Sequence, residues 1–546
     1  MSEQRMRLVK WMPAVDSEET AGVESRCTVE AIEAGLAGVP DATVVSATIN
    51  RSGVFQPPPG PFGELPPETG LPPYCDVQVD LRSDGGHVSR IEVWVPLAWN
   101  ERFLGVTGGG NRTTPDYFFR EYVRQANLPR GVRNGFATAA TDGANKDPRF
   151  ADWGLDVETG ELDWDLIRIW SHLATHHTAV VGKAVTQAIH GIAPKYSYLQ
   201  GTSGGGRQTL MSAQRYPDDY DGMWAADCAL NYAKLAAGCI WPMVVMKEYD
   251  DYVSPAKLSA FRDAAAAALE RDNGVVNDHI GVFDTWHFDP SKIVGSDTQD
   301  GPITETNAAV MQRIWEGPRS VQGRRLWGGV PATTETWGQN IHQVGIAATA
   351  EEDGRRVPAP FMMALGIGAW YSGDPNWDWT TLTLENYEEF FDGVAERFAE
   401  TATADPDLSG LRDSGHKLII SHGVNDEVIT PWAALDYFRD VLTEMGGVEG
   451  TSDYVRFFVG AGDAHSNITK GPGISLAAGM KALMAWVEEG IAPDVIDGEK
   501  FDPNLERITQ TRPVYAYPYA PRYNGTGDPL NASSYDKTLI PSPSLS

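Results

Sequence analysis

The chain has 546 residues, of which 42% are hydrophobic, and its formal net charge is -30. It is longer than the roughly 250–300 residues at which a single hydrophobic core stops growing, so we expect a main domain and a second compact unit. The negative charge argues against nucleic acid or an anionic membrane surface as a partner, but it does not exclude a neutral or aromatic substrate.

The beginning of the chain lacks the continuous apolar stretch of a signal peptide, and about 18 consecutive apolar residues occur nowhere in it. We therefore expect a cytoplasmic protein, or a secreted one if a leader was removed. The four cysteines have no CxxC spacing, so the usual zinc signatures are absent.

Short apolar runs that end in glycine or polar turns recur along the chain. In order they are "RIEVWVPL" (90–97), "RFLGVTGGG" (102–110), "GFATAATDG" (135–143), "YSYLQGTSGGG" (196–206), "KLIISHGVNDE" (417–427) and "YVRFFVGAGDAH" (454–465). Continuous apolar runs are typical of buried strands in a largely parallel sheet. Helical stretches at 167–190 and 431–445 lie between some of them. This alternation predicts a doubly wound α/β core.

One long region interrupts the alternation. Residues 232–404 are predicted to form an inserted lid domain, which divides the core into a first part (1–231) and a second part (405–546). The insertion holds eight of the seventeen tryptophans: Trp241, Trp286, Trp315, Trp327, Trp337, Trp370, Trp377 and Trp379. They either line an aromatic-binding cavity or form the insertion's own core. The tail from Phe501 is expected to be an extended surface segment.

Residues 201–205, "GTSGG", match the pattern G-x-S-x-G between a predicted strand and a predicted helix. That context is typical of a nucleophile elbow, in which a strained turn exposes the serine hydroxyl and glycines avoid clashes with strand and helix. Ser203 is therefore the predicted nucleophile. The alternative is a glycine turn whose serine caps the helix.

A nucleophilic serine needs a base that is held by an acid, and in this fold both come from the ends of later strands. Asp426 and His465 follow the two predicted strands near the end of the chain. Other residues compete for the roles or suggest other sites: Asp463 and Glu427 as the acid, His422 as a packed neighbour, and His172 with His176 as a helix pair without the HExxH glutamate.

The developing oxyanion needs two backbone amides. We expect one from Gly204, directly after the serine, and one from Gly108, Gly109 or Gly110 after an early strand. A phosphate-binding role for these glycines would require the lysine of a P-loop, which is absent there.

Four segments together resemble the tannase and feruloyl esterase family, which includes the mono(hydroxyethyl) terephthalate hydrolases. They are "GTSGGGRQTLMSAQRYPDDYDG", "DPNWDW", "DPDLSGLRDSGHKLIISHGVNDEVITP" and "RPVYAYPYAPRYNGTGD". The resemblance implies an α/β-hydrolase core with a lid, and hydrolysis of small aromatic or phenolic esters through Ser203, Asp426, His465 and an acyl-enzyme. It also places Cys27 and Cys75 at the family's N-terminal disulfide, where they are either reduced or bridged.

The sequence departs from this family at a second disulfide, because Thr202 and Ala464 replace the cysteines beside the serine and the histidine. The loss suits a reducing compartment. The resemblance further implies a structural calcium in the lid, with ligands from Glu270, Asn273 and Asn277 and from the carbonyls of Val275 and His279. Two of these positions have asparagine in place of aspartate, which weakens Ca²⁺ binding; the alternative is a loop held by hydrogen bonds alone. No cofactor is expected for catalysis.

The predicted function is therefore hydrolysis of aromatic carboxylic esters. A lactonase, an amidase or a C–C hydrolase acting on another small molecule is the alternative within the same fold. A catalytically silent binding protein is the alternative from a different class.

Overall fold

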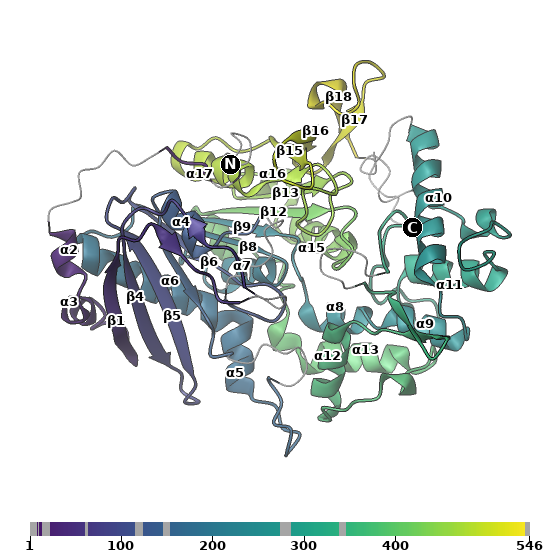
Figure 1. Cartoon of the computed structure of the whole chain (residues 1–546), viewed down its shortest axis with the longest axis horizontal. Coiled ribbons are helices and arrows are strands. Elements are labelled where there is room, and N and C mark those ends of the chain that lie inside the picture. Colours follow the sequence, from purple (N-terminus) through teal and green to yellow (C-terminus); the bar gives the residue numbers. More distant parts are fainter. Residues whose placement is uncertain are drawn as a thin grey trace.

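The computed structural model describes residues 8, 10–13, 22–59, 64–114, 124–145, 153–273, 286–337 and 345–540. Its centre is a nine-stranded sheet with the strand order β1-β4-β5-β7-β6-β8-β9-β12-β13 (Figure 1). The strands are β1 (Ala42–Asn50), β4 (Tyr74–Arg82), β5 (Val88–Pro96), β6 (Arg102–Val106), β7 (Ala137–Thr141), β8 (Tyr196–Thr202), β9 (Gly222–Ala226), β12 (Lys417–Gly423) and β13 (Val455–Gly460).

In the sheet order β7-β6-β8-β9-β12-β13, all neighbouring strands are parallel, which confirms the predicted core. The run at 90–97 differs, because β5 pairs antiparallel with both β4 and β7. The turn between β4 and β5 covers only residues 83–87. So short a connection joins antiparallel neighbours, whereas a parallel crossover needs a dozen residues or more.

Both faces of the sheet are buried. Neighbouring residues of one strand, such as Ile419 and Ile420, belong to two different core clusters because successive side chains point to opposite faces. One cluster includes side chains from α3 (Val29–Gly35), α6 (Ala174–His190), α7 (Gly204–Arg215) and α15 (Pro431–Glu444). The other includes side chains from α4 (Leu128–Arg133) and α17 (Leu476–Glu489).

The predicted insertion, called the insert below (residues 232–404), is mainly helical and lies beyond one end of the sheet (Figure 1). Its main elements are α8 (Tyr232–Gly238), α9 (Trp241–Glu248), α10 (Pro255–Asn273), α11 (Glu305–Glu316), the hairpin β10 (Thr349–Glu352) and β11 (Arg355–Pro358), α12 (Met362–Ser372) and α13 (Tyr387–Arg397). A third core cluster is built mostly from these elements and includes the buried Trp241 and Trp370. The domain boundaries stay a prediction.

The tail is more regular than expected. Its strands β15 (Val495–Phe501) and β16 (Ile508–Tyr515) pair antiparallel and are joined by β14 (Gly473–Ile474) in a three-stranded sheet, and β17 (Tyr519–Tyr523) pairs with β18 (Tyr535–Leu539). Val514 is buried and belongs to the same core cluster as α17. Burial of this kind explains why the segment forms sheet and is not merely laid on the surface.

The shorter α-helices and strands of the described chain are α2 (Val23–Arg26), β2 (Val54–Phe55), β3 (Glu68–Thr69), α5 (Trp164–Arg168), α14 (Ser409–Ser414) and α16 (Gly447–Thr451). A disulfide joins Cys27, directly after α2, to Cys75 in β4, whereas Cys228 and Cys239 are buried thiols. Among the helices of the described residues, none combines the length and the apolar character needed to cross a bilayer.

Candidate active site

Ser203 occupies the sharp turn between β8 and α7. Its backbone has φ 63° and ψ -122°, in a region that residues other than glycine seldom adopt. The carbonyl of Ser203 accepts hydrogen bonds from the amides of Arg207 and Ala229, both at 3.0 Å, and these bonds hold the turn. Within the described residues the serine side chain makes no capping hydrogen bond to the helix. The capping interpretation is therefore wrong, and the geometry is that of a nucleophile elbow.

The glycines around the serine allow the loop after β6 to lie against the turn. A Cβ atom at Gly205 would stand 2.5 Å from the carbonyl oxygen of Gly108, and one at Gly204 would stand 2.9 Å from the amide nitrogen of Gly110. Side chains at these positions would force the two segments apart. The structure thus brings together Gly204 and the glycines after β6, as the oxyanion prediction requires; the assignment of individual amides stays a prediction.

Asp426 and His465 meet at the carboxyl ends of β12 and β13. His465 Nδ1 lies 2.7 Å from Asp426 Oδ2, and both side chains are buried. The other carboxylate oxygen, Oδ1, accepts hydrogen bonds from the amides of Val428 (2.9 Å) and Ile429 (2.7 Å). One oxygen is thereby fixed by the backbone and the other is presented to the imidazole.

The competing residues have other partners. His422 Nε2 lies 3.3 Å from Asp426 Oδ2 and 3.1 Å from the carbonyl oxygen of Ile429, so this histidine packs behind the acid, as predicted for a neighbour. Glu427 accepts a hydrogen bond from the backbone amide of His465 at 3.0 Å. Asp463 forms an ion pair with Arg124. Of the three carboxylates, Asp426 makes the 2.7 Å contact with the imidazole of His465.

Burial and charge set the protonation of this group. Burial disfavours the charged imidazole of His465, but the negative charge and hydrogen bond of Asp426 outweigh it and raise its pKa to about 9. Burial also disfavours the charged carboxylate of Asp426, yet the charge of His465 and the hydrogen bond from His422 lower its pKa. Burial and the nearby charge of Asp426 raise the pKa of Glu427 to about 7. The pair is therefore held as an ionised carboxylate beside an imidazole of increased basicity.

A buried ionic network lies directly behind the histidine. Arg124 Nη1 donates to Asp227 Oδ2 at 2.6 Å, and Arg124 Nη2 pairs with Asp463. Asp227 also accepts hydrogen bonds from the amide of Gly423 (3.1 Å) and from the amide (3.1 Å) and hydroxyl (3.0 Å) of Ser466. The network thus fixes the residues on both sides of His465.

This network joins the elements that carry the serine and the histidine. The amide of Ser203 donates to the carbonyl of Ala226 at 2.9 Å, and the next residue, Asp227, holds Ser466. The two segments are therefore linked by hydrogen bonds and an ion pair close to Thr202 and Ala464, the two positions at which the resemblance implies a disulfide in other members of the family.

Arg207 fixes the nucleophile helix from the other side. The helix predicted at 167–190 contains a π-helical turn, Ile169–Leu173, a wide turn that is often found near functional sites. Arg207 Nη1 donates to the carbonyl of Ser171 (2.9 Å), and its Nη2 donates to that of Trp170 (3.0 Å). Its guanidinium also stacks 3.9 Å from the Trp170 ring centroid. The strained turn at Ser203 is thus supported by buried contacts of Arg207, one helical turn away.

Sequence reasoning did not find Arg124, Asp227 or Arg207. Asp227 had a usable signal, since it follows β9 at the edge of the sheet where Asp426 and His465 also lie. Arg124 and Arg207 carry no motif, and their roles arise from burial.

The histidine pair and the side chains near enough to share an ion have ordinary partners, and most of the predicted calcium residues lie outside the described residues. His172 Nδ1 lies 2.7 Å from the Tyr216 hydroxyl, and His176 Nδ1 lies 2.8 Å from Asp219. Asp227, His422 and Asp426 are close enough to share an ion, but all three are already engaged in the contacts above. Of the calcium residues, Glu270 is exposed near the end of α10 and Asn273 ends that helix; Val275, Asn277 and His279 lie outside the described residues.

Comparison with known proteins gives consistent matches. The family model described as tannase and feruloyl esterase matches residues 75–538. A protein of Arthroderma benhamiae named probable feruloyl esterase is 33% identical over 473 residues, covering 85% of each chain. An uncharacterized esterase of Xanthomonas campestris pv. campestris is 27% identical, covering 97% of this chain and 94% of its own.

Two solved structures share the fold. The tannin acyl hydrolase from Aspergillus niger superposes with a TM-score of 0.78 at 22% identity and covers 96% of each chain. Feruloyl esterase B from Aspergillus oryzae superposes with a TM-score of 0.75 at 21% identity, covering 94% of this chain and all of its own. Together with the sheet order, these matches establish the α/β-hydrolase fold.

Proposed function

The chain belongs to the tannase and feruloyl esterase family, and from this premise we propose that it hydrolyses small carboxylic esters of phenolic or other aromatic acids through Ser203, His465 and Asp426. Carboxylic ester hydrolysis is the activity of the family. The observation that carries the residue assignment is the strained elbow at Ser203 on the same sheet edge as the 2.7 Å contact between His465 and Asp426.

The mechanism follows from these positions. In the neutral form of His465, Asp426 holds the ring proton on Nδ1, and Nε2 accepts the Ser203 proton as the hydroxyl oxygen attacks the ester carbonyl. Gly204 and an amide among Gly108, Gly109 and Gly110 receive the oxyanion. The imidazolium then protonates the leaving alcohol, and water repeats the sequence on the acyl-enzyme.

The acid part of the substrate is the finer proposal. The relatives named above are called feruloyl esterase and tannin acyl hydrolase, which supports a phenolic acyl group. The amidase, lactonase and C–C hydrolase alternatives use the same residues, so only the substrate distinguishes them. A catalytically silent binding protein is disfavoured, because the chain has both the contact between His465 and Asp426 and the strained turn at Ser203.

A substrate panel tests the proposal. Purified enzyme and Ser203→Ala should be assayed with methyl ferulate, methyl gallate, ethyl butyrate, an aromatic lactone and feruloyl amide. We expect turnover of the aromatic methyl esters, with kcat/KM at least tenfold above that of ethyl butyrate, and its loss in the variant. Preference for the amide or lactone, or equal activity in Ser203→Ala, would contradict it.

The compartment is also a matter for proposal. The Cys27–Cys75 disulfide favours an oxidising compartment, because disulfides persist mainly in exported proteins. This weighs against the cytoplasmic prediction that the loss of the second disulfide suggested. Fractionation of the native host, followed by thiol labelling of Cys27 and Cys75 without reductant, tests the assignment.

A further inference from the structure

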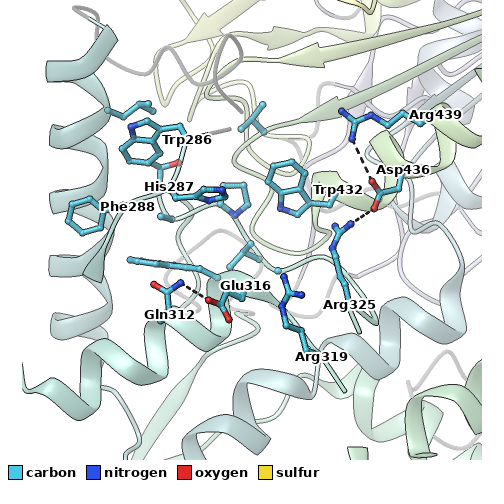
Figure 2. Close-up of a pocket in the computed structure, with 18 residues that line it drawn as sticks. Trp286, His287, Phe288, Gln312, Glu316, Arg319, Arg325, Trp432, Asp436 and Arg439 are labelled. Carbon is cyan, nitrogen blue, oxygen red and sulfur yellow. Dashed lines mark hydrogen bonds and ion pairs between the residues drawn. The ribbon is translucent and has the colours of Figure 1, made fainter. Parts of the chain in front are cut away.

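A cleft distinct from the candidate active site lies between the insert and α15 (Figure 2). Its volume is about 270 Å³, and its described lining residues do not include Ser203, Asp426 or His465. They come from the end of α10, from residues 286–288, from α11, from the loop at 319–333, from Val424 directly after β12 and from α15. The size is near the lower end of ligand pockets, roughly 300 Å³, which suits a molecule with a single aromatic ring.

The walls are aromatic on both sides. Trp286, Phe288 and Trp315 line the side of the insert, and Phe288 packs edge-on against Trp315 with ring centroids 6.2 Å apart. Trp432 forms the opposite wall; Figure 2 shows its ring directed into the cleft toward His287. Gly328 packs closely on this tryptophan, since a Cβ atom there would stand 2.6 Å from the Trp432 Cβ. The half-buried rings of Trp286, Trp315 and Trp432 favour a flat apolar ring as the ligand.

Arginine side chains lie along the lower and right sides of the cleft in Figure 2, with Glu316 and Asp436 among them. The charged side chains of the described lining are three arginines, Arg319, Arg325 and Arg439, and two carboxylates, Glu316 and Asp436. Arg325 Nη1 donates to Asp436 at 2.9 Å, and Arg439 lies 3.9 Å from the same carboxylate. Glu316 accepts a hydrogen bond from Gln312 at 2.7 Å. Among the described lining residues, arginines therefore outnumber carboxylates by one, on a chain whose formal net charge is -30.

Arg319 is the donor that this arrangement leaves for a ligand. Its Nη1 donates to the carbonyl oxygen of Gly323 at 3.2 Å, and no carboxylate of the described residues lies within 4.0 Å of its guanidinium. The guanidinium offers five N–H groups in a planar fork that matches a carboxylate. A half-buried arginine beside tryptophan faces thus selects for an anionic group attached to an aromatic ring.

We propose that this cleft binds a small aromatic carboxylate, with its ring between Trp432 and the aromatic residues of the insert and its carboxylate on Arg319. The proposal stands on the cleft alone and does not depend on the esterase assignment. Acids of this class are also what the proposed reaction would release, so the cleft would be a second place for its product.

Binding can be measured with the reaction centre blocked. The protein is treated with a fluorophosphonate, the extent of labelling is recorded by mass spectrometry, and ferulate is titrated by calorimetry. Coniferyl alcohol, which has the same ring without the carboxylate, tests the charge requirement. The variants are Arg319→Ala and Trp432→Ala, and Arg324→Ala is the matched control because its guanidinium pairs with Glu388 and Asp392 outside the cleft.

We expect saturable ferulate binding to the blocked protein, at least tenfold weaker in Arg319→Ala and in Trp432→Ala, and unchanged in Arg324→Ala. Coniferyl alcohol should bind at least tenfold more weakly than ferulate. The proposal is overturned by absence of saturable binding at millimolar ferulate, by equal affinity in Arg319→Ala with an unchanged melting temperature, or by equal affinity for the alcohol. Failure of the fluorophosphonate to label the protein would instead count against the esterase mechanism. The comparison of ferulate affinity between the wild type and Arg319→Ala would still test the cleft.

Discussion

The contact between Asp426 and His465 determines how the candidate site responds to pH. The raised pKa of His465, about 9, means that the free protein carries a protonated imidazole at neutral pH, which cannot accept the serine proton. Three carboxylates raise the pKa of His465: Asp426 has the largest effect, and Asp227 and Glu427 add to it. Removal of the Asp426 charge should therefore lower this pKa.

We therefore predict that kcat/KM for an aromatic ester rises with pH, and that the midpoint of this rise lies above pH 6.5, near 9. In Asp426→Asn the midpoint should fall and kcat should drop by about 10⁴-fold, since the imidazole loses its tautomer and its counter-charge. Profiles from pH 5 to 10 with a chromogenic ester measure both effects. A midpoint that is the same in both proteins would show that Asp426 does not set it.

The elbow glycines are a second test at the scale of single residues. In Gly205→Ala the new methyl group would stand 2.5 Å from the Gly108 carbonyl oxygen, so the loop after β6 must move away from the turn. We expect loss of activity and a lower melting temperature. Gly38→Ala is the control, because a Cβ atom there meets nothing within 4 Å, and its free energy of unfolding should change by less than about 0.5 kcal/mol. Full activity of Gly205→Ala would mean that the two segments need not touch.

At the scale of elements, the Arg124 network holds the loops after β9, β12 and β13 together. Asp227→Asn keeps the shape of the side chain but removes the charge that Arg124 and Ser466 contact. Breaking a buried pair costs about 3–5 kcal/mol, so we predict a clear fall in melting temperature and in kcat.

Rescue separates positioning from general destabilisation. The variant Asp227→Asn is combined with Thr202→Cys and Ala464→Cys, which form a disulfide under oxidising conditions. This disulfide should restore part of kcat, and the gain should disappear when reductant is added. If the double cysteine restores the melting temperature but not kcat, the network stabilises the fold without positioning His465. The same cysteines in the wild type should change kcat little.

The elements that the sequence predicted best are those whose pattern is local. Continuous apolar runs located β6, β7, β8, β12 and β13, and the glycine pattern located Ser203. The orientation of β5 depends on a neighbour in β4 that the pattern did not reveal, and the tail strands depend on packing against α17. Asp426 and His465 could be predicted from their place after strands, whereas Arg124 and Arg207 could not, because long-range burial alone gives them partners.

At the scale of the whole molecule, the insert is predicted to be stabilised by calcium. The predicted donors are all oxygen atoms, which suits Ca²⁺, but Glu270 supplies the only formal charge, so affinity should be modest. We expect EDTA to lower the melting temperature and excess Ca²⁺ to restore it, with a smaller shift in Glu270→Gln. An identical melting temperature with and without EDTA would contradict the calcium prediction.

The central claim is that Ser203 is an activated nucleophile supported by His465. The most direct measurement is labelling with a fluorophosphonate, with the modified peptide identified by mass spectrometry in wild type, Ser203→Ala and His465→Ala. We predict stoichiometric modification at Ser203, none in Ser203→Ala and strongly slowed labelling in His465→Ala, with all three proteins folded. Absence of labelling in the folded wild type, or labelling at another residue, would contradict the account.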